Sequence, residues 1–384
     1  MRIAVSGCGI AGATVAALLA RLGHEVTVFE QAAHCQPVGA GIMLQPSGQE
    51  VLKRLGLSDQ ILAESARLDG LDASLACGKS LIQLRYNGLD ESTRAWGVHR
   101  GLLFDQLFGE CQASGVEIRN GTTLHNYRRI GKCVAVVDQA GREFGDFDFV
   151  LATDGSRSKL REASSLRCKL VEYPYAALWT TGPCHQVQRC LHQVIDGTQR
   201  LVGLLPIGEG RCSFFWGVRA DRYESLRSSG IESWKDEVIE LCPPAAELLD
   251  TIQRFDELTF SGYRHVQMRQ WNNDSILFLG DAAHASSPHL GQGANLALED
   301  AVVFADALRD TGEFHAACLQ FRKLRYRKVR YYQQLTRLLS PFFQSDIPLL
   351  SLGRNVALPW FPRVPFVRRR MLRTLCGLHC GWWR

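Results

Sequence analysis

Two glycine-rich turns, one at the N-terminus and one late in the sequence, most strongly constrain the fold of this 384-residue chain. The first turn, Gly7-x-Gly9-x-x-Gly12, follows an apolar segment at residues 2–6 and precedes residues 11–22, whose apolar positions recur with helical spacing. A second apolar, β-branched segment at residues 24–29 ends beside Glu30. This order of strand, glycine turn, helix and strand predicts a βαβ unit and an α/β domain with a parallel sheet.

Each glycine of the first turn meets a separate requirement of dinucleotide binding. Gly7 permits a tight turn, Gly9 lets the backbone approach a pyrophosphate, and Gly12 lets the helix pack closely on the strand. The N-terminus of the helix offers free N–H groups and a partial positive charge to the phosphates. Glu30 is placed to accept hydrogen bonds from the ribose hydroxyls of an adenosine. The turn predicts a site for the ADP half of a dinucleotide, and a purely structural glycine turn is the alternative.

The second turn lies in Gly280-Asp-Ala-Ala-His-Ala-Ser-Ser-Pro288-His-Leu-Gly291-Gln-Gly293-Ala-Asn295. Asp281 follows an apolar strand, where it can accept a hydrogen bond from a polyol chain. The N–H groups of residues 291–295 begin a helix and can stabilise negative charge on an electron-accepting ring, beside the rigid wall formed by Pro288. A third motif, residues 152–161, places Asp154 in a strand-to-helix turn, which suits either a pyrophosphate contact or an ordinary Asp-Gly turn. The distant turns together predict one long ligand held at both ends.

The three motifs, in this order and spacing, resemble the class A FAD-dependent flavoprotein monooxygenases, the aromatic hydroxylases with the p-hydroxybenzoate hydroxylase fold. The resemblance extends to about residue 340. It implies an α/β fold in which a Rossmann-like FAD-binding domain with a βαβ N-terminus is interleaved with a smaller mixed β-sheet substrate domain and followed by a C-terminal helical segment. We expect the FAD-binding domain at residues 1–68, 96–168 and 265–314, the β-rich substrate domain at 69–95 and 169–264, and a basic helical tail at 315–384.

The same resemblance implies FAD as cofactor, NADPH or NADH as co-substrate, and O2 as oxidant. The enzyme would hydroxylate or epoxidise a hydrophobic, aromatic small molecule through a C4a-hydroperoxyflavin. By this resemblance Arg100 precedes a Leu-rich helix that contacts FAD, Asp281 binds the ribityl and phosphate region, and residues 291–295 line the isoalloxazine. The residues expected to bind the cofactor are Gly7, Gly9, Ala11, Gly12, Glu30, Gln31, Gly41, Arg100, Asp154, Asp281, Pro288, Gly291, Gln292, Gly293, Ala294 and Asn295.

The sequence does not single out a catalytic base. Some aromatic hydroxylases place a histidine in the loop at residues 41–45, where this chain has Met43. His289 with the adjoining Pro288 region, Tyr263 and His99 are candidates, although a lone histidine is more often structural and catalysis without a side-chain base is a further alternative. Residues 201–206 and 212–216 are expected to form paired strands whose apolar faces cover the flavin. That surface favours an apolar substrate, but packing within a sheet explains the same residues equally well.

Composition adds expectations about location and partners. The 13 cysteines show no Cys-x-x-Cys spacing, so we expect no metal site, reduced thiols and a cytoplasmic protein. Residues 315–384 hold fourteen Lys and Arg against one acid, Asp346, and mix arginines with aromatic residues that include Trp382 and Trp383. This mixture suits peripheral contact with the inner face of an anionic membrane, and a helix docked on an acidic body is the alternative. No nucleic-acid recognition motif accompanies the charge, and we expect a monomer or a homodimer.

Three other functions remain alternatives at this point. Flavin-dependent halogenases carry a Trp-x-Trp-x-Ile-Pro string, and the nearest approach to it in this chain is Phe215-Trp216-Gly217. A flavin-linked reductase of isoprenoid chains is the second alternative. A flavin-bound sensor without turnover is the third, although such a protein need not keep the ring-facing donors of the late turn.

Overall fold

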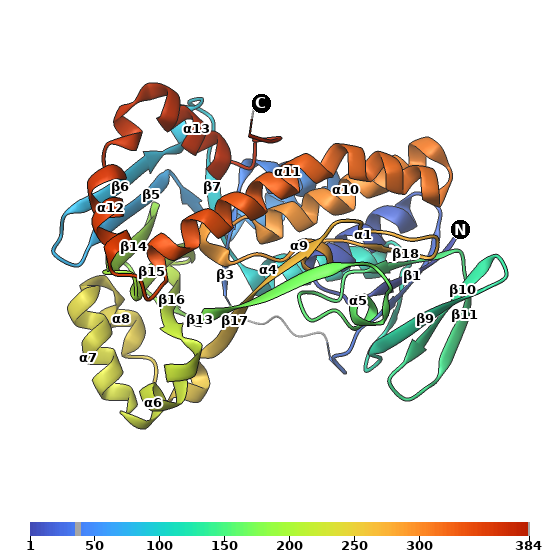
Figure 1. Ribbon diagram of the computed structural model, residues 1–384, viewed down its shortest axis with the longest axis horizontal. Helices are drawn as coiled ribbons and strands as arrows, with labels where there is room; N and C mark the ends of the chain where they lie inside the picture. Colours follow the sequence, from blue (N-terminus) through green and yellow to red (C-terminus); the bar gives the residue numbers. More distant parts are fainter. Residues whose placement is uncertain (35–39, 383–384) are drawn as a thin grey trace.

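A five-stranded parallel sheet carries the N-terminal glycine turn in the computed structural model, which describes residues 1–34 and 40–382 (Figure 1). Trp383, expected in the aromatic tail, lies outside the described residues. The strand order is β18-β12-β1-β2-β8, and every neighbouring pair is parallel. The strands are β1 (Arg2–Ser6), β2 (Glu25–Phe29), β8 (Glu117–Arg119), β12 (Phe149–Ala152) and β18 (Ile276–Phe278). With helix α1 (Ile10–Arg21) between β1 and β2, the predicted βαβ unit is confirmed.

Helices pack beside this sheet and bury its apolar side chains. Helix α1 contacts α4 and α10, and α10 in turn contacts α2 and α11. The helices of this half are α2 (Pro46–Leu55), α3 (Ser58–Ala63), α4 (Arg100–Ala113), α5 (Lys159–Ala163), α9 (Asp281–His284), α10 (Gly293–Thr311) and α11 (Phe314–Phe343). A three-stranded antiparallel sheet also belongs to this half and comprises β9 (Leu124–Ile130), β10 (Cys133–Asp138) and β11 (Glu143–Phe147). Burial on both faces explains why the parallel strands read as continuous apolar runs.

The other half of the molecule is built on a mixed seven-stranded sheet in the order β17-β13-β16-β15-β14-β5-β6. Only the β14–β5 pair is parallel. The strands are β5 (Gly70–Leu75), β6 (Ser80–Arg85), β13 (Cys168–Pro183), β14 (Cys190–Asp196), β15 (Arg200–Gly208), β16 (Arg211–Arg219) and β17 (Thr259–Met268). Three short helices, α6 (Tyr223–Ser228), α7 (Ile231–Leu241) and α8 (Ala246–Leu249), accompany the sheet. The α/β fold class with a parallel and a mixed sheet is therefore confirmed.

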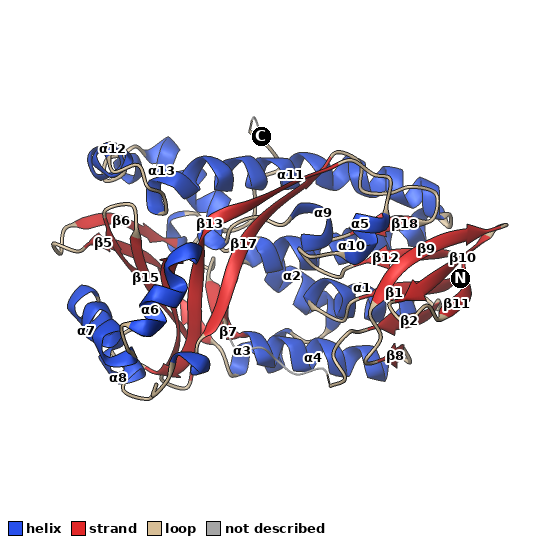
Figure 2. Ribbon diagram, turned by 60° about the horizontal axis from the view of Figure 1, so that its bottom comes forward, coloured by secondary structure: helices blue, strands red, loops and turns tan. Residues whose placement is uncertain are grey.

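Long strands join the two halves. Strands β13 and β17 pair with each other and run from the seven-stranded sheet toward the parallel sheet (Figure 2). The boundary expected at residue 264 thus falls inside β17, because this strand continues to Met268. A small sheet of β3 (Gly41–Leu44), β7 (Ala95–His99) and β4 (Ala66–Leu68) also contacts β15 of the larger sheet.

Residues 315–382 pack against the rest of the molecule and do not form a separate tail. Helix α11 packs along α10, and its Arg325 is buried there. Helix α11 ends at Phe343 and is followed by α12 (Leu349–Ala357) and α13 (Pro365–Leu375). Within the described part of the chain, no helix is long and apolar enough to cross a membrane.

Candidate active site

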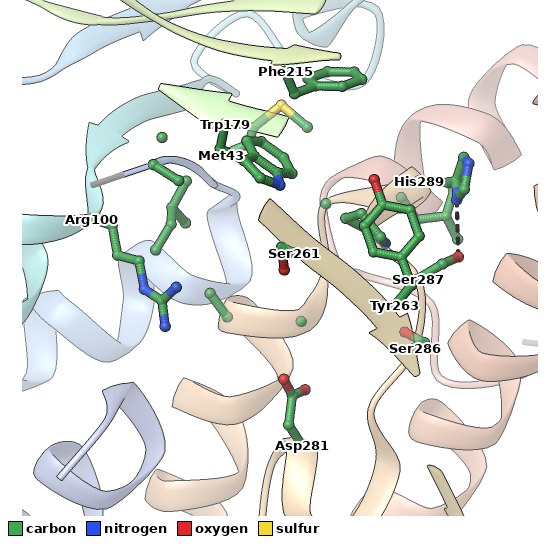
Figure 3. A pocket seen from close by; sticks show the side chains of 18 of the residues that line it. Met43, Arg100, Trp179, Phe215, Ser261, Tyr263, Asp281, Ser286, Ser287 and His289 are labelled. Carbon is green, nitrogen blue, oxygen red and sulfur yellow. Dashed lines mark hydrogen bonds between the residues drawn. The ribbon is translucent and has the colours of Figure 1, made fainter. Parts of the chain in front are cut away.

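A cavity of about 520 Å³ lies at the carboxyl ends of β1, β12 and β18, where the parallel sheet faces the seven-stranded sheet. This is the edge at which open α/β sheets bind ligands. Figure 3 shows Asp281 and Arg100 toward one end, Tyr263 and His289 along one side, and Trp179, Phe215 and Met43 toward the other end. The sequence-predicted residues that line the cavity are Gly9, Ala11, Gly41, Arg100, Tyr263, Asp281, Pro288, His289, Gly291, Gly293 and Ala294.

The N-terminal turn leaves space for a ligand at one glycine only. Gly7 has a φ of +91°, and a Cβ added there would lie 2.8 Å from the carbonyl oxygen of Thr153. A Cβ on Gly12 would lie 2.0 Å from the carbonyl oxygen of Gly7. A Cβ on Gly9 would meet no atom within 4 Å. Gly7 and Gly12 are therefore required by packing, whereas the space beside Gly9 fits a ligand pyrophosphate above the N-terminus of α1.

Glu30 lies against the same turn. One carboxylate oxygen accepts a hydrogen bond from the Cys8 N–H at 2.7 Å, and the other accepts one from the Ala32 N–H at 2.9 Å. Each oxygen keeps a further lone pair, so ribose hydroxyls can still donate to this carboxylate. The neighbouring Gln31 is exposed.

Asp281 and Arg100 are the charged groups at the turn-bearing end of the cavity. Neither side chain has a hydrogen bond or ion pair with any described residue, and both line the cavity. The Asp281 side chain is exposed to the cavity, while desolvation by the protein atoms around it raises its pKa and the charges of His284 and Arg100 partly oppose that shift. An acceptor and a cation without partners in one cavity fit a ligand with hydroxyl and phosphate groups, as the ribityl diphosphate of FAD has.

A buried ionic cluster positions the loop that bears Asp281. Asp300 of α10 accepts hydrogen bonds from the Gly280 N–H at 3.1 Å, from His284 Nε2 at 2.5 Å and from Arg325 Nε at 2.7 Å. Burial alone would raise the pKa of Asp300, but the charges of His284 and Arg325 outweigh it and lower the pKa to about 2. Arg325 also pairs with Glu299. Sequence reasoning missed this cluster, although Glu299 and Asp300 directly follow the late turn.

The third motif supports the same loop from the other side. Buried Arg161 donates to the carbonyl oxygen of Ala282 at 2.8 Å and to that of Ser156 at 2.7 Å. Asp154 does not line the cavity, since its Oδ2 accepts from the Leu160 N–H at 3.4 Å at the start of α5. Burial raises the pKa of Asp154. The motif therefore contributes its backbone near Gly155 to the cavity wall, and the Asp154 side chain faces α5.

Two side chains of the late turn face away from the cavity. Asn295 is fully buried, accepts from the Gln45 N–H at 2.9 Å and donates to the carbonyl oxygen of Met43 at 3.0 Å. Gln292 donates to the carbonyl oxygen of Leu375 at 2.7 Å. Both side chains brace the turn against β3 and α13, while the backbone of residues 291–294 faces the cavity.

Aromatic and aliphatic side chains from the seven-stranded sheet form the opposite end of the cavity. Trp179 of β13 lies beside Phe215 of β16, with ring centroids 5.3 Å apart. The paired strands expected near residues 201–206 and 212–216 are confirmed as β15 and β16. The remaining apolar residues at this end are Leu71, Leu191, Leu201, Leu205, Phe343 and Leu375.

His289 is held as a neutral imidazole. Ser340 Oγ donates to the carbonyl oxygen of Thr336 at 2.7 Å, so Ser287 Oγ, 2.7 Å away, donates to Ser340. Ser287 then accepts from His289 Nδ1 at 2.9 Å, which places the imidazole proton on Nδ1. Burial lowers the pKa of His289 to about 4. His289 is therefore a poor base at neutral pH.

The other base candidates have different surroundings. Tyr263 lines the cavity with its ring centroid 6.1 Å from that of His289, and burial raises its pKa, so the phenol stays protonated. His99 does not line the cavity, because its Nδ1 accepts from the Gly101 N–H at 3.1 Å and caps α4. Across residues 1–34 and 40–382, no group of three or more His, Cys, Asp or Glu side chains is arranged to hold a metal ion.

Comparison with known proteins shows that this chain is similar to FAD-dependent monooxygenases. Residues 1–313 match the family model described as FAD binding domain. The chain is 29% identical over 346 residues to the aurachin C monooxygenase/isomerase of Stigmatella aurantiaca, covering 86% of both chains. It is 28% identical over 329 residues to the 6-hydroxynicotinate 3-monooxygenase of Pseudomonas fluorescens, covering 81% of this chain and 83% of that enzyme. In fold it is similar to Klebsiella pneumoniae HpxO complexed with FAD and uric acid, with a TM-score of 0.81, 21% identity and 97% of each chain covered.

Proposed function

This chain belongs to the FAD-binding domain family, the class A flavoprotein monooxygenases, and from that premise we propose that it uses NADPH or NADH and O2 to oxygenate a neutral, hydrophobic aromatic molecule. The observation that carries the proposal is that one cavity joins the two glycine turns, at Gly9 and Gly293, to an aromatic wall formed by Trp179 and Phe215. A cofactor gripped by the turns would present its reactive ring to a substrate held by that wall.

The expected cofactor contacts follow from the cavity. Gly9 and the N-terminus of α1 would hold the pyrophosphate, Glu30 the adenosine ribose, and Asp281 with Arg100 the ribityl and phosphate region. The backbone N–H groups of Gly293 and Ala294 would lie along the ring, because the Gly291 N–H already donates to the carbonyl oxygen of Pro288. FAD, when bound, supplies the redox and oxygen chemistry.

The protein's own side chains exclude water and orient the substrate. Trp179, Phe215 and Met43 give an apolar surface in which a flat ring can stack. His289 and Tyr263 offer neutral polar groups at the side of the cavity, and neither changes charge near pH 7. Their role is to form hydrogen bonds with the substrate, and the proposed reaction does not require either of them as a base.

A neutral substrate is favoured by the pairing of the cations. Among the described residues that line the cavity, the cationic side chains are Arg100 and Arg264. Arg264 is paired with Glu172 at 2.6 Å, and Arg100 lies at the end assigned to the cofactor. Within residues 1–34 and 40–382, no cation is thus left to neutralise a substrate carboxylate at the aromatic end.

The relatives favour this reaction over the other flavin chemistries considered. Both curated relatives are named as monooxygenases, and one of them acts on 6-hydroxynicotinate, a hydroxylated aromatic ring. The halogenase and isoprenoid-reductase alternatives are not favoured. We further propose that the protein is a cytoplasmic monomer or homodimer.

Anaerobic mixing of the FAD-loaded protein with NADPH or NADH tests the proposal. Each nucleotide is added with and without a panel of neutral aromatic compounds, and flavin bleaching is followed by absorbance. We expect one nucleotide to bleach the flavin faster when the right compound is present, and O2 then to yield a product with one added oxygen atom. If neither nucleotide reduces the flavin with any compound, the proposed reaction is wrong.

A further inference from the structure

Helix α12 presents its apolar side chains to solvent. Leu349, Leu352 and Val356 share one face of the helix and are 73%, 62% and 69% exposed. Arg354, the only charged residue of the helix, is instead 4% exposed. An amphipathic helix at a protein surface normally has the opposite orientation.

Buried hydrogen bonds fix this orientation. Arg354 Nη1 donates to the carbonyl oxygens of Gly197 at 2.9 Å and Phe342 at 2.7 Å. Its guanidinium also lies over the Phe343 ring, 5.7 Å from the centroid. Rotating α12 to bury its leucines would remove Arg354 from these partners and leave two carbonyl groups unpaired. The outward apolar face is therefore a stable feature of the fold.

The exposed apolar surface continues beyond α12 into a segment that is rich in arginine. The aromatic side chains of Trp360 and Phe366 are 61% and 73% exposed. The guanidinium carbon of Arg363 lies 4.4 Å from the centroid of the Trp360 ring. Residues 347–382 contain neither Asp nor Glu, and of their six arginines all except Arg354 are exposed or partly exposed. We call this surface, formed by the exposed residues of 347–373, the C-terminal face.

We propose that the C-terminal face docks on an anionic lipid bilayer. Apolar and aromatic side chains would enter the region between headgroups and acyl chains, and the arginines would pair with the acidic headgroups. A second copy of this chain fits less well, because a symmetric contact would bring two sets of arginines together without acids to neutralise them. A nucleic acid would match the charge but leave the apolar face uncovered.

The helix ends on either side of the C-terminal face form part of the cavity wall. Phe343, at the end of α11, and Leu375, at the end of α13, both line the cavity. Docking would thus bring the substrate end of the cavity close to the lipid surface, from which a lipophilic substrate could enter. This delivery step rests on the proposed function, whereas lipid binding itself does not.

Vesicle flotation tests the docking directly. The full-length, FAD-loaded protein is mixed with vesicles of phosphatidylcholine alone or with phosphatidylglycerol added, at about 0.1 M and about 0.5 M salt. We expect it to float only with the anionic vesicles and to be released by the higher salt. The variant L349Q/L352Q/V356Q should bind these vesicles about 100-fold more weakly, because it removes three apolar anchors.

A matched control is available on α11. Leu319 and Leu324 are each 58% exposed but lie in the N-terminal half of α11, whereas α12 follows the C-terminal end of α11. The variant L319Q/L324Q should therefore float like the parent protein. FAD content and flavin reduction by NAD(P)H are measured for every variant in the absence of vesicles. If these remain normal while flotation is lost, docking is separated from the proposed reaction.

Three results would overturn the docking proposal. The first is a parent protein that stays unbound with anionic vesicles at low salt. The second is equal flotation of the parent and L349Q/L352Q/V356Q. The third is a dimer in sedimentation analysis that this variant dissociates, without vesicle binding, since the face would then be a contact between copies of the chain.

Discussion

Replacement of Asp281 by asparagine should weaken FAD binding without destabilising the protein that lacks FAD. The carboxylate forms no hydrogen bond or ion pair within residues 1–34 and 40–382, and desolvation by the protein atoms around it raises its pKa. A group whose folded pKa is raised stabilises the fold below its unfolded pKa and loses that contribution as the pH rises through the folded pKa. Because the Asp281 side chain is exposed to the cavity, the cost of its ionised carboxylate to the apoprotein at pH 7 is small, and Asp281→Asn should leave apoprotein stability unchanged or slightly higher.

The holoprotein should respond in the opposite sense. A hydrogen bond between a ligand hydroxyl and an ionised carboxylate contributes about 1.5–3 kcal/mol, which corresponds to a Kd for FAD about 10- to 150-fold higher in the variant. Titration of apoprotein with FAD, followed by flavin fluorescence, measures that Kd, and thermal unfolding of both forms measures stability. Asp300→Asn is the control, because it breaks the buried cluster and should destabilise both forms. An unchanged Kd in Asp281→Asn, or an apoprotein that loses as much stability as the holoprotein, would refute the assignment of Asp281 to the cofactor.

Three further predictions follow from the packing. Gly9→Ala should fold with normal apoprotein stability yet bind FAD at least about tenfold more weakly. Gly12→Ala should fail to accumulate as folded protein, because its Cβ would lie 2.0 Å from a backbone oxygen. Fluorescence titration measures FAD binding and expression yield measures folding, and equal behaviour of the two variants would contradict the prediction. Asp300→Asn should lower the free energy of unfolding by about 3 kcal/mol at pH 7. Because the folded pKa of Asp300 is about 2, the stabilisation by its carboxylate is present above pH 4 and is lost as the pH falls toward 2. The difference in free energy of unfolding between the parent and Asp300→Asn, measured in urea, should therefore be smaller at pH 3 than at pH 7. A difference that stays constant would contradict the prediction. Trp179→Ala should raise the KM for the aromatic substrate about tenfold while leaving FAD affinity unchanged. Steady-state kinetics and an FAD titration measure the two quantities. If the ring has a purely structural role, FAD affinity will fall as well.

The glycine turns could be predicted from the sequence because their requirements are local. A positive φ at Gly7 and the close approach of Gly12 to the loop backbone are set within a few residues. The flanking apolar runs fix the strands and the helix in the same way. The parallel sheet and the motif-bearing edge of the cavity follow from these local patterns.

The direction of individual side chains depends on distant partners and could not be predicted. Asn295 was expected along the ring, but its amide joins residues 43 and 45 of another element. Asp154 was expected near the pyrophosphate, and it faces the start of α5 instead. Arg325, counted in the sequence as part of a basic tail, is the buried partner of Asp300. For Asn295 and Asp154 the motif marked a segment that borders the cavity, and long-range packing decided which atoms of that segment face the cavity.

Helix α12 shows why periodicity alone cannot settle which face of a helix is buried. Its sequence separates apolar residues from one arginine, and either face could in principle pack against the protein. Which face is buried depends on whether the protein surface under the helix offers carbonyl groups that can accept from the arginine. The acceptors here, the carbonyl oxygens of Gly197 and Phe342, come from separate parts of the chain. Once these acceptors hold Arg354, the leucines must face outward, and a hydrophobic surface is left without cover. Docking on an anionic bilayer, as we propose for the C-terminal face, would cover this surface, and the absence of acidic residues from positions 347–382 suits that charge.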